Sequence, residues 1–410
     1  MSVLRENDQG RFRDRSLSNS DRKSLIEDSG VSAFSNYDRK INLLIAAAGL
    51  DIGGLEVVIQ QLAQTIDRSR FNLTLCCIKV CGVIGEDLAR EGFDIVTLSN
   101  SDEPKVDYFT FIKLLKLIRL KKIDIVHTHT VDALADAAVC KLLMPRLKLV
   151  HTFHFGNYPH RETRIMWQER IFSKLANRVF AVGEVQRQQL MAVYHFPEEK
   201  IGRVWNGISP LPSCHDGSFR LRVGAENRIL IGTIATLIEQ KGLRDFLAVA
   251  REFRDAGDRV RFVIVGDGHL RPELDTIRRE LGLDDTVVFT GWVLNASEVA
   301  LPAFDIFFQP SLWEAMSIVI LEAMAAGKAI VATRVGENPF VIEDDVDGLL
   351  VEAGDIDGMT AALGRLINDE KLRKRLGKAA ARKIAEQFTA EHMTRAYERL
   401  YIETVGADLP

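Results

Sequence analysis

Residues 305–327, DIFFQPSLWEAMSIVILEAMAAG, decide the fold of this chain. The stretch begins with a short, continuous apolar run at 305–309, which is typical of a strand buried on both faces. A loop follows, and an apolar pattern with helical spacing runs from Ile318 to Ala326. A buried strand that leads through a loop into a helix is the repeating unit of a parallel α/β sheet.

The same unit recurs on both sides of this stretch. Short apolar runs alternate with amphipathic segments from Arg39 onward, except at 209–226, which is rich in Pro and Gly and has no periodicity. We therefore predict an α/β protein with two doubly wound, Rossmann-like parallel-sheet domains that face a cleft, at 40–208 and 227–388, joined by a linker at 209–226. A last helix is predicted near 390–404, within a closing segment at 389–410.

Residues 1–39 differ in composition from the rest. Charged residues and serines dominate them, so they cannot bury enough apolar surface to offset their ordering entropy, and we predict a disordered polar tail. The N-terminus has no apolar segment typical of a signal peptide, and no stretch reaches the roughly 18 apolar residues of a membrane span. The expectation is a cytoplasmic protein.

Composition excludes several classes of function. The chain has 410 residues, 53 basic and 57 acidic side chains and a net charge of −4, so nothing favours nucleic acid as a partner. Five cysteines do not make a disulfide scaffold. Cys76, Cys77 and Cys81 are close in sequence, but their spacing fits reduced core thiols better than a metal site.

Two carboxylates mark the stretch that decides the fold. Glu314 precedes the helix and Glu322 lies inside it, so both can face one cavity, where carboxylates accept hydrogen bonds from sugar hydroxyls. The plain alternative is a pair of surface glutamates. The first N–H groups of this helix, at Ser317, Ile318 and Val319, are placed to hold a phosphate.

Two other loops follow strands in the same way. Lys241 lies between a strand and a helix, where it would meet an anion, although such a lysine alone is more often a surface charge. Gly53 and Gly54 directly follow the first strand and let the backbone approach a ligand closely. Neither this loop nor Gly266-Asp267-Gly268 fits the Gly-x-Gly-x-x-Gly dinucleotide fingerprint, so a nicotinamide enzyme is poorly supported.

Histidines gather at the ends of two strands of the first domain. His127 and His129 end one strand, and His151 and His154 lie in and after the next. No Cys, Asp or Glu at suitable spacing accompanies them, so contact of His154 with substrate is favoured over metal ligation. The alternative is that His127 and His151 are hydrogen-bonded strand residues that point away from the cleft.

These segments, in this order, resemble the retaining glycosyltransferases of family 4, which have the GT-B fold. The resemblance covers about residues 40–405. Its strongest element is the Glu-x7-Glu motif at Glu314 and Glu322, within the longer string Pro-Ser-x-x-Glu to Leu-Glu-Ala-Met-Ala-x-Gly. The other matches are Gly53-Gly54-x-Glu56, Thr152-x-His154, Asn206-Gly207, Lys241-Gly242 and Gly266-Asp267-Gly268.

The resemblance implies a role for each matching residue. Glu314 would bond the donor sugar, Glu322 the ribose of the nucleotide, and Lys241 would neutralise the diphosphate. His154 would contact the transferred sugar, and the closing helix would cross back onto the first domain. The remaining positions expected around the donor are Gly53, Gly54, Thr236, Gly266, Gly268, Ser317, Ile318 and Val319.

The chain departs from the family pattern at three places. Thr236 stands near the position where the family usually has Arg as a second phosphate cation, for which Arg271 or Arg334 could substitute. Ala315 stands where Gly is common. The family's Gly-Gly-x-x-Glu stretch is matched only in part by 336–340, Gly-Glu-Asn-Pro-Phe.

The implied reaction is transfer of a hexose from a nucleotide-diphospho-sugar, such as a UDP- or GDP-hexose, to a saccharide or lipid-linked acceptor. The resemblance implies retention of anomeric configuration, no protein nucleophile, no metal and no cofactor, and a place in polysaccharide or glycolipid synthesis. Two Asp-x-Asp strings, at 345–347 and 355–357, are interpreted as solvated turns. A catalytically weak relative that binds sugar nucleotide or partners without turnover, a phosphorylase and a sugar-nucleotide epimerase stay open as alternatives.

Residues 108–122 form a basic amphipathic pattern, with lysines and arginines beside large apolar residues. Such a helix can lie on an anionic membrane, and many family 4 relatives act on lipid-linked acceptors. The alternative is a core-packing helix with a solvated basic face. A peripheral contact at the inner face of the membrane is therefore a second expectation for location.

Overall fold

The computed structural model describes residues 39–99, 109–211, 217–254 and 259–406. The tail predicted at 1–39 therefore lies almost wholly outside the described residues. Residues 41–410 form one compact unit.

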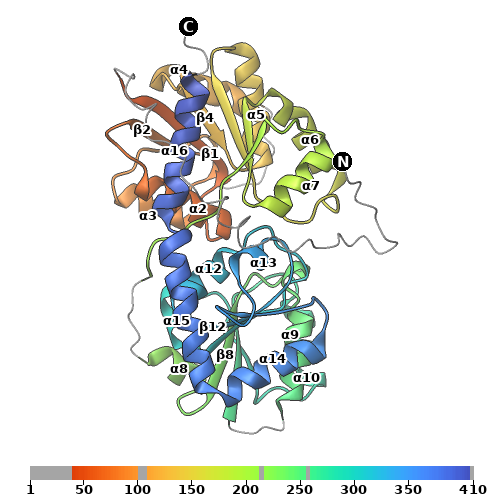
Figure 1. Ribbon diagram of the computed structural model, residues 1–410. Helices are drawn as coiled ribbons and strands as arrows, with labels where there is room; N and C mark the ends of the chain where they lie inside the picture. Colours follow the sequence, from red (N-terminus) through yellow and green to blue (C-terminus); the bar gives the residue numbers. More distant parts are fainter. Residues whose placement is uncertain (1–38, 100–108, 212–216, 255–258, 407–410) are drawn as a thin grey trace. The chain divides into compact units, whose positions relative to one another are not determined.

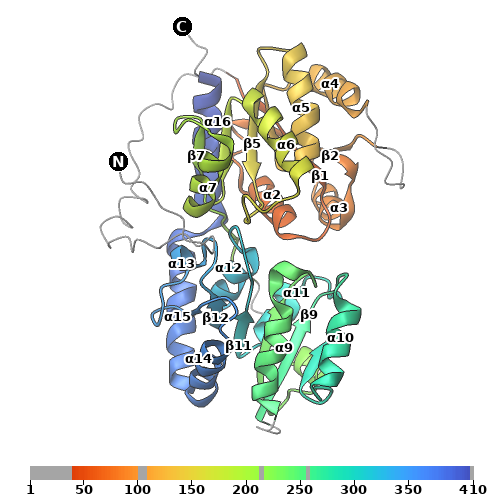
Figure 2. The same ribbon diagram turned by 90° about the vertical axis from the view of Figure 1, so that its right-hand side faces the viewer.

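The first half of this unit is a parallel sheet of seven strands in the order β3-β2-β1-β4-β5-β6-β7, with helices on both faces (Figures 1 and 2). The strand order reverses between β1 and β4, which makes a topological switch point. The strands are β1 (Ile41–Gly49), β2 (Phe71–Val80), β3 (Ile95–Thr97), β4 (Ile125–Thr128), β5 (Lys148–Phe153), β6 (Arg178–Ala181) and β7 (Ile201–Arg203). The helices are α2 (Gly54–Thr65), α3 (Gly82–Arg90), α4 (Thr110–Lys121), α5 (Val131–Leu143), α6 (Thr163–Phe172) and α7 (Glu184–Tyr194).

The second half repeats the plan with six parallel strands in the order β10-β9-β8-β11-β12-β13. Its switch point lies between β8 and β11. The strands are β8 (Ile229–Ile234), β9 (Val260–Val265), β10 (Val287–Phe289), β11 (Ile306–Gln309), β12 (Ala329–Thr333) and β13 (Leu349–Val351). The helices are α8 (Ser218–Arg222), α9 (Leu243–Glu252), α10 (Arg271–Glu280), α11 (Ala296–Val299), α12 (Ile318–Ala325), α13 (Asn338–Val341), α14 (Ile356–Asn368) and α15 (Glu370–Gln387).

Strand β11 shows why the apolar runs are continuous. Phe307 and Phe308 are adjacent and therefore point to opposite faces of the sheet, yet both are fully buried, in different apolar clusters. Both faces of this strand are covered, so no position is left for a polar residue to alternate with. The predicted class of two doubly wound parallel-sheet domains is confirmed.

Four short helices were not predicted: α3, α8, α11 and α13. Three of them have only four or five residues, which is too few for a helical period to be visible in sequence. The helix α8 lies inside the segment predicted as a linker, and its Phe219 is buried with its ring 6.2 Å from that of Phe304. This part of 209–226 therefore packs into the second half.

The last helix, α16 (Ala390–Gly406), packs against the first half (Figure 1). Tyr397 and Tyr401 are buried, and their hydroxyls bond to Thr152 Oγ1 at 3.1 Å and to His127 Nδ1 at 2.6 Å. The backbone N–H of Asp67 donates to Glu398 at 2.7 Å. The helix thus ties the end of the chain to strands β4 and β5.

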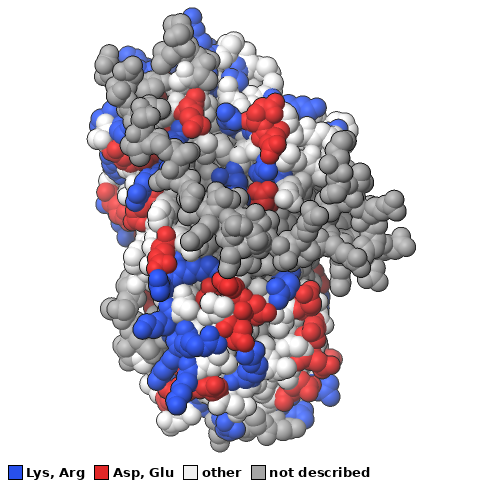
Figure 3. Space-filling view, viewed as in Figure 1, with Lys and Arg blue, Asp and Glu red and all other residues white. Residues whose placement is uncertain are grey.

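Charge is unevenly distributed on the surface. Lys and Arg side chains gather over α15 on the face drawn in Figure 3. On this helix, Lys383 pairs with Asp347 and Arg375 pairs with Asp345. None of the described helices is both long enough and apolar enough to span a bilayer.

Candidate functional site

Three loops of the second half meet at the carboxyl ends of adjacent strands. Lys241 follows β8, the Gly266–Gly268 loop follows β9, and Glu314 follows β11. Since parallel strands end at one edge of the sheet, side chains far apart in sequence converge beside the switch point between β8 and β11.

Glu314 is the centre of this cluster. Its carboxylate is buried and accepts at Oε1 from Lys241 Nζ at 2.6 Å, Gln309 Nε2 at 2.9 Å and Ser311 Oγ at 2.8 Å. Oε2 accepts from Gln240 Nε2 at 3.0 Å. Each carboxylate oxygen offers about two acceptor sites, so Oε1 is fully used while Oε2 can accept one more bond. A ligand hydroxyl can therefore bond to Oε2 without displacing one of these donors.

Close backbone contacts hold the Lys241 loop against the Glu314 loop. Gly242 has φ +60°, and a Cβ atom there would lie 1.9 Å from the carbonyl oxygen of Pro310. The N–H of Leu312 donates to the Gln240 carbonyl at 2.8 Å. Only glycine fits this left-handed position at such close contact, so the Lys-Gly pair keeps the ammonium within reach of Glu314.

The Gly-Asp-Gly loop packs against the loop of Thr236. A Cβ atom on Gly266 would lie 2.1 Å from the carbonyl oxygen of Ala235, and one on Gly268 would lie 2.6 Å from that of Leu237. Thr236 itself is exposed between these contacts. The predicted donor-binding residues Thr236, Gly266 and Gly268 are therefore neighbours.

The amino end of α12 opens onto the same region. Ser317 is its N-cap, with Oγ accepting from the Ile320 N–H at 3.4 Å. The N–H groups of Ile318 and Val319 belong to the first turn, which has no partner within the helix and favours an anion. A Cβ atom on Gly54 would lie 3.5 Å from Ile318 Cγ1, so the glycine loop after β1 is beside this turn.

Two more strand ends of the first half contact the Glu314 loop. A Cβ atom on Gly156, after β5, would lie 2.1 Å from both Glu314 C and Ala315 N. Asn206, after β7, donates through Nδ2 to the Met316 carbonyl at 3.4 Å. The segment from Glu314 to Ile318 is therefore enclosed by loops from both sheets.

Glu322 lies apart from the Glu314 cluster. It is buried on α12 and accepts a hydrogen bond of 2.6 Å from Ser297 Oγ on α11. Burial raises the pKa of its carboxyl to about 7, against the lowering effect of Ser297. A ligand hydroxyl that donated to Glu322 would favour its charged form.

The histidines form a buried group at the ends of β4 and β5. His127 bonds to Tyr401 and, through Nε2, to Thr152 Oγ1 at 2.8 Å, and His151 Nδ1 bonds to Thr128 Oγ1 at 2.9 Å. Both are strand residues with satisfied hydrogen bonds, as the plain alternative predicted.

His154 has a different partner. Its Nε2 lies 2.9 Å from His129 Nδ1, and the two rings are stacked with centroids 5.2 Å apart. Burial lowers the pKa of both rings, that of His154 to about 3, so both are neutral.

Sequence reasoning missed Glu337. This residue of the second half is buried with its Oε1 3.1 Å from the N–H of Gln186, at the amino end of α7 in the first half. A Cβ atom on Gly183 would lie 2.1 Å from Glu337 Cδ, so a larger residue there would displace the Glu337 side chain. Burial raises the pKa of Glu337 to about 7, against bonds from three backbone N–H groups. Its only sequence signal was the departure from Gly-Gly at 336–337.

The two arginines proposed as substitute phosphate cations have other partners. Arg271 pairs with Asp275 at 2.7 Å, and Arg334 pairs with Asp344 at 3.2 Å. The structure does not bring either into contact with Lys241 or Glu314. In the described ranges, no three His, Cys, Asp or Glu side chains are grouped as a metal site requires. Asp347 is buried, so the first Asp-x-Asp string is not a fully solvated turn.

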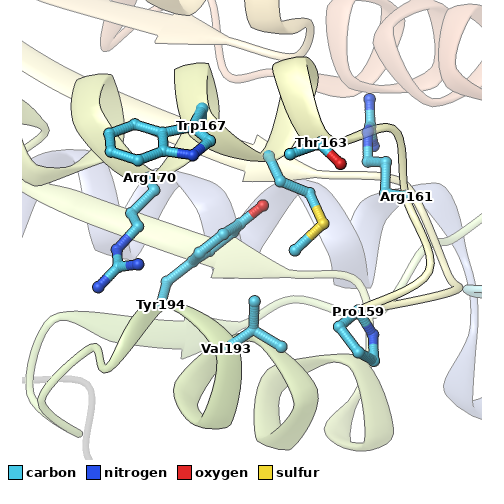
Figure 4. Close-up of a pocket in the computed structure, with 8 residues that line it drawn as sticks. Pro159, Arg161, Thr163, Trp167, Arg170, Val193 and Tyr194 are labelled. Carbon is cyan, nitrogen blue, oxygen red and sulfur yellow. The ribbon is translucent and has the colours of Figure 1, made fainter.

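A pocket of about 320 Å³ lies in the first half between α6 and α7 (Figure 4). It combines aromatic and cationic side chains. Its lining residues are Pro159, Arg161, Thr163, Met166, Trp167, Arg170, Val193 and Tyr194.

The comparisons with known families assign the two halves. Residues 52–210 match the family model described as Glycosyltransferase Family 4, and residues 228–369 match the model described as glycosyl transferases group 1. The chain is a glycosyltransferase of the GT-B fold.

The names of similar proteins agree with this assignment. The chain is 26% identical over 370 residues to an Escherichia coli UDP-Gal:alpha-D-GlcNAc-diphosphoundecaprenol alpha-1,3-galactosyltransferase, covering 86% of this chain and 95% of the relative. It is 26% identical over 324 residues to a Bacillus anthracis N-acetyl-alpha-D-glucosaminyl L-malate synthase, covering 74% and 81%. The Anabaena protein HepE in complex with UDP-glucose shares the fold, with a TM-score of 0.77 and 20% identity over 88% of this chain and 99% of HepE.

The buried Glu337 gives the glycosyltransferase a testable pH dependence. Since the pKa of Glu337 is about 7 in the fold and 4.5 ordinarily, the folded protein holds a proton that the unfolded chain releases. Stability is therefore lost as the pH rises from about 4.5 through 7, by roughly 3 kcal/mol for one such group. Glu337→Gln, which keeps an acceptor for Gln186, should match the parent at pH 5 and exceed it at pH 8 in urea unfolding.

Glu391→Gln is the control for this variant, because Glu391 is exposed on α16. Its unfolding free energy should follow that of the parent at every pH. A Glu337→Gln protein that parallels the parent from pH 5 to 8 would contradict the burial argument.

Proposed function

We propose that this glycosyltransferase transfers a hexose from a nucleotide-diphospho-sugar to a saccharide or lipid-linked acceptor, with retention of anomeric configuration. The observation that carries the proposal is the ion pair between buried Glu314 and half-buried Lys241, beside the first turn of α12. This arrangement provides a cation, helix N–H groups and a carboxylate within one region enclosed by two sheets.

The charges of the reaction fit these groups. Cleavage of the sugar–phosphate bond leaves negative charge on the diphosphate, which Lys241 and the N–H groups of Ile318 and Val319 would stabilise. A bound diphosphate would compete with Glu314 for the Lys241 ammonium. Glu314 Oε2, which accepts a single bond from Gln240, would accept from a hydroxyl of the donor sugar.

The neighbouring proteins support a nucleotide-sugar donor. HepE is described in complex with UDP-glucose, and the E. coli relative is named as a UDP-Gal transferase. The loop expected to meet the diphosphate has exposed Thr236 where the family usually has Arg, which is the observation that favours the second candidate, a catalytically weak relative.

The pocket between α6 and α7 supports an acceptor with an anionic group. Arg161 and Arg170 line it together with Trp167 (Figure 4). Arg161 stacks on Phe155, next to His154, with Cζ 4.5 Å from the ring centre. The E. coli relative is named for a sugar on diphosphoundecaprenol, an acceptor that carries phosphate. Arg161 also pairs with Glu169 at 3.4 Å, so Arg170 is the cation that we propose for the phosphate of such an acceptor.

Isotope transfer tests the proposal. The purified full chain would be titrated by calorimetry with UDP, GDP and ADP hexoses, and the tightest donor, labelled in its sugar, would be offered to lipid-diphosphate saccharides with and without EDTA. We expect label in the acceptor, in the α-anomer from an α-linked donor by NMR, and no effect of EDTA. Donor binding without label transfer would favour the weak relative.

Glu322 provides a finer test of the nucleotide site. If ribose hydroxyls donate to Glu322, they lower its pKa from about 7, so binding must release a proton and UDP-glucose affinity must rise between pH 6 and 8. Calorimetry in buffers of different ionisation enthalpy measures this proton. Glu322→Gln should abolish the release and weaken binding about tenfold or more.

The control for this test is Glu280→Gln, at an exposed position on α10. It should leave both affinity and proton release unchanged. Unchanged UDP-glucose affinity in the Glu322→Gln protein would refute the assigned ribose contact.

We also propose that α4 contacts an anionic membrane at the cytoplasmic face. Apolar side chains remain solvent-exposed at the ends of α4 and α5, at 80% for Leu120, 63% for Leu142 and 55% for Leu143. These two helices pack side by side (Figure 2), and exposed Lys116 and Arg119 lie on α4. Apolar side chains beside cations suit an anionic lipid surface.

Vesicle sedimentation tests this contact. Leu120→Glu should lower binding to vesicles rich in phosphatidylglycerol by about tenfold, since it removes an inserted side chain and adds repulsion. Leu221→Glu is the matched control, because Leu221 is 66% exposed on α8 of the second half. Equal binding of the parent and Leu120→Glu proteins would exclude α4 as the contact.

A further inference from the structure

The hydrogen bond between His129 and His154 indicates which ring nitrogen of each histidine carries the proton. His129 directly follows β4 and His154 directly follows β5, and these strands are neighbours in the sheet. Their rings therefore meet at the carboxyl edge, with His129 Nδ1 2.9 Å from His154 Nε2.

A hydrogen bond between two imidazoles needs one N–H and one bare nitrogen. Burial lowers the pKa of both rings, so each is neutral and carries one proton. Either His129 donates from Nδ1 to His154, or His154 donates from Nε2 to His129.

The second ring nitrogen of His129, Nε2, distinguishes these two arrangements. This atom is buried and has no hydrogen-bond partner in the part of the chain that the structure describes. If His154 were the donor, this Nε2 would carry a buried N–H with no acceptor, which is rare in folded proteins. If His129 donates from Nδ1, Nε2 is a bare acceptor and no donor is left unpaired.

The arrangement in which His129 donates also fixes the proton of His154. Since its Nε2 accepts, the one proton of the neutral His154 ring is on Nδ1. His154 is partly exposed, and its Nδ1 has no hydrogen bond within the described residues. An N–H donor is thereby presented at the edge of the sheet.

We propose that His129 is a positioning residue that fixes His154 as an Nδ1–H donor to the bound substrate. The proposal rests on the proposed function, because it takes His154 to contact the transferred sugar. A His154 that already carries its proton on Nδ1, and whose Nε2 is occupied, cannot accept the proton of the acceptor hydroxyl. The histidine orients the sugar and is not the general base.

NMR of the full chain with isotope-labelled histidine tests the proton positions without substrate. The ring-nitrogen signals that are present in the parent spectrum and absent from that of the His154→Gln protein belong to His154. We expect them to show the proton on Nδ1. In His129→Phe, which fills the same space but cannot donate, the proton should redistribute toward Nε2. His127→Gln is the control: it disturbs the same buried group and should leave the His154 pattern unchanged. A parent protein with His154 protonated on Nε2 would overturn the proposal.

Kinetics supply the second test, with donors that each lack one sugar hydroxyl. For the complete donor, His129→Phe should lower kcat/KM roughly tenfold, the effect of one lost hydrogen bond. For the single donor that lacks the hydroxyl bonded by His154, His129→Phe and the parent should react at equal rates. His129→Gln, whose amide can still donate to His154, should recover most of the activity.

Equal losses for His129→Phe with every donor would mean a merely structural role and would overturn the proposal. If the parent transfers no sugar from any donor, the proposed function fails instead. In that case the NMR pattern still decides whether His129 fixes the proton of His154.

Discussion

The burial of the Glu314 carboxylate is the constraint on which the rest of the site depends. A charged group out of water needs hydrogen-bond donors on all sides, and here they come from β11, from the loop after β8 and from the loop of Glu314 itself. Satisfying this one carboxylate therefore fixes three segments relative to one another. The same requirement keeps the Lys241 ammonium beside Glu314, where we propose that the diphosphate binds.

Close backbone contacts at glycines hold the other loops of the site together. Gly242 meets Pro310, and Gly156 meets Glu314 and Ala315, at distances that no side chain would permit. Glycines in these loops act by steric absence, which lets loops from both sheets enclose the segment that begins α12. Glu337 adds a polar contact of the same kind, because its carboxylate lies against Gly183 and the first N–H groups of α7.

Buried ionisable groups make the protonation of this site depend on pH. Glu322 and Glu337 both have pKa values raised to about 7 by burial, while the histidines at the strand ends are kept neutral. Neutral histidines act as directed donors and acceptors, so proton position rather than charge determines what His154 offers to a ligand. The hydroxyls of Tyr397 and Tyr401 extend this polar group to the last helix of the chain.

The sequence alone determined the two doubly wound sheets, because a strand buried on both faces must be apolar throughout. It also determined the segments that carry Lys241 and Glu314, and the helix that carries Glu322. It could not show α8, α11 and α13, whose four or five residues are too few to show a helical period. It also could not show that Glu322 bonds to Ser297 rather than joining Glu314, that His129 is the partner of His154, or that Glu337 caps a helix of the other half. Only the tertiary structure decided these contacts, because each joins residues of different helices or strand ends. Sequence spacing carries no information about which of these elements meet when the sheets form.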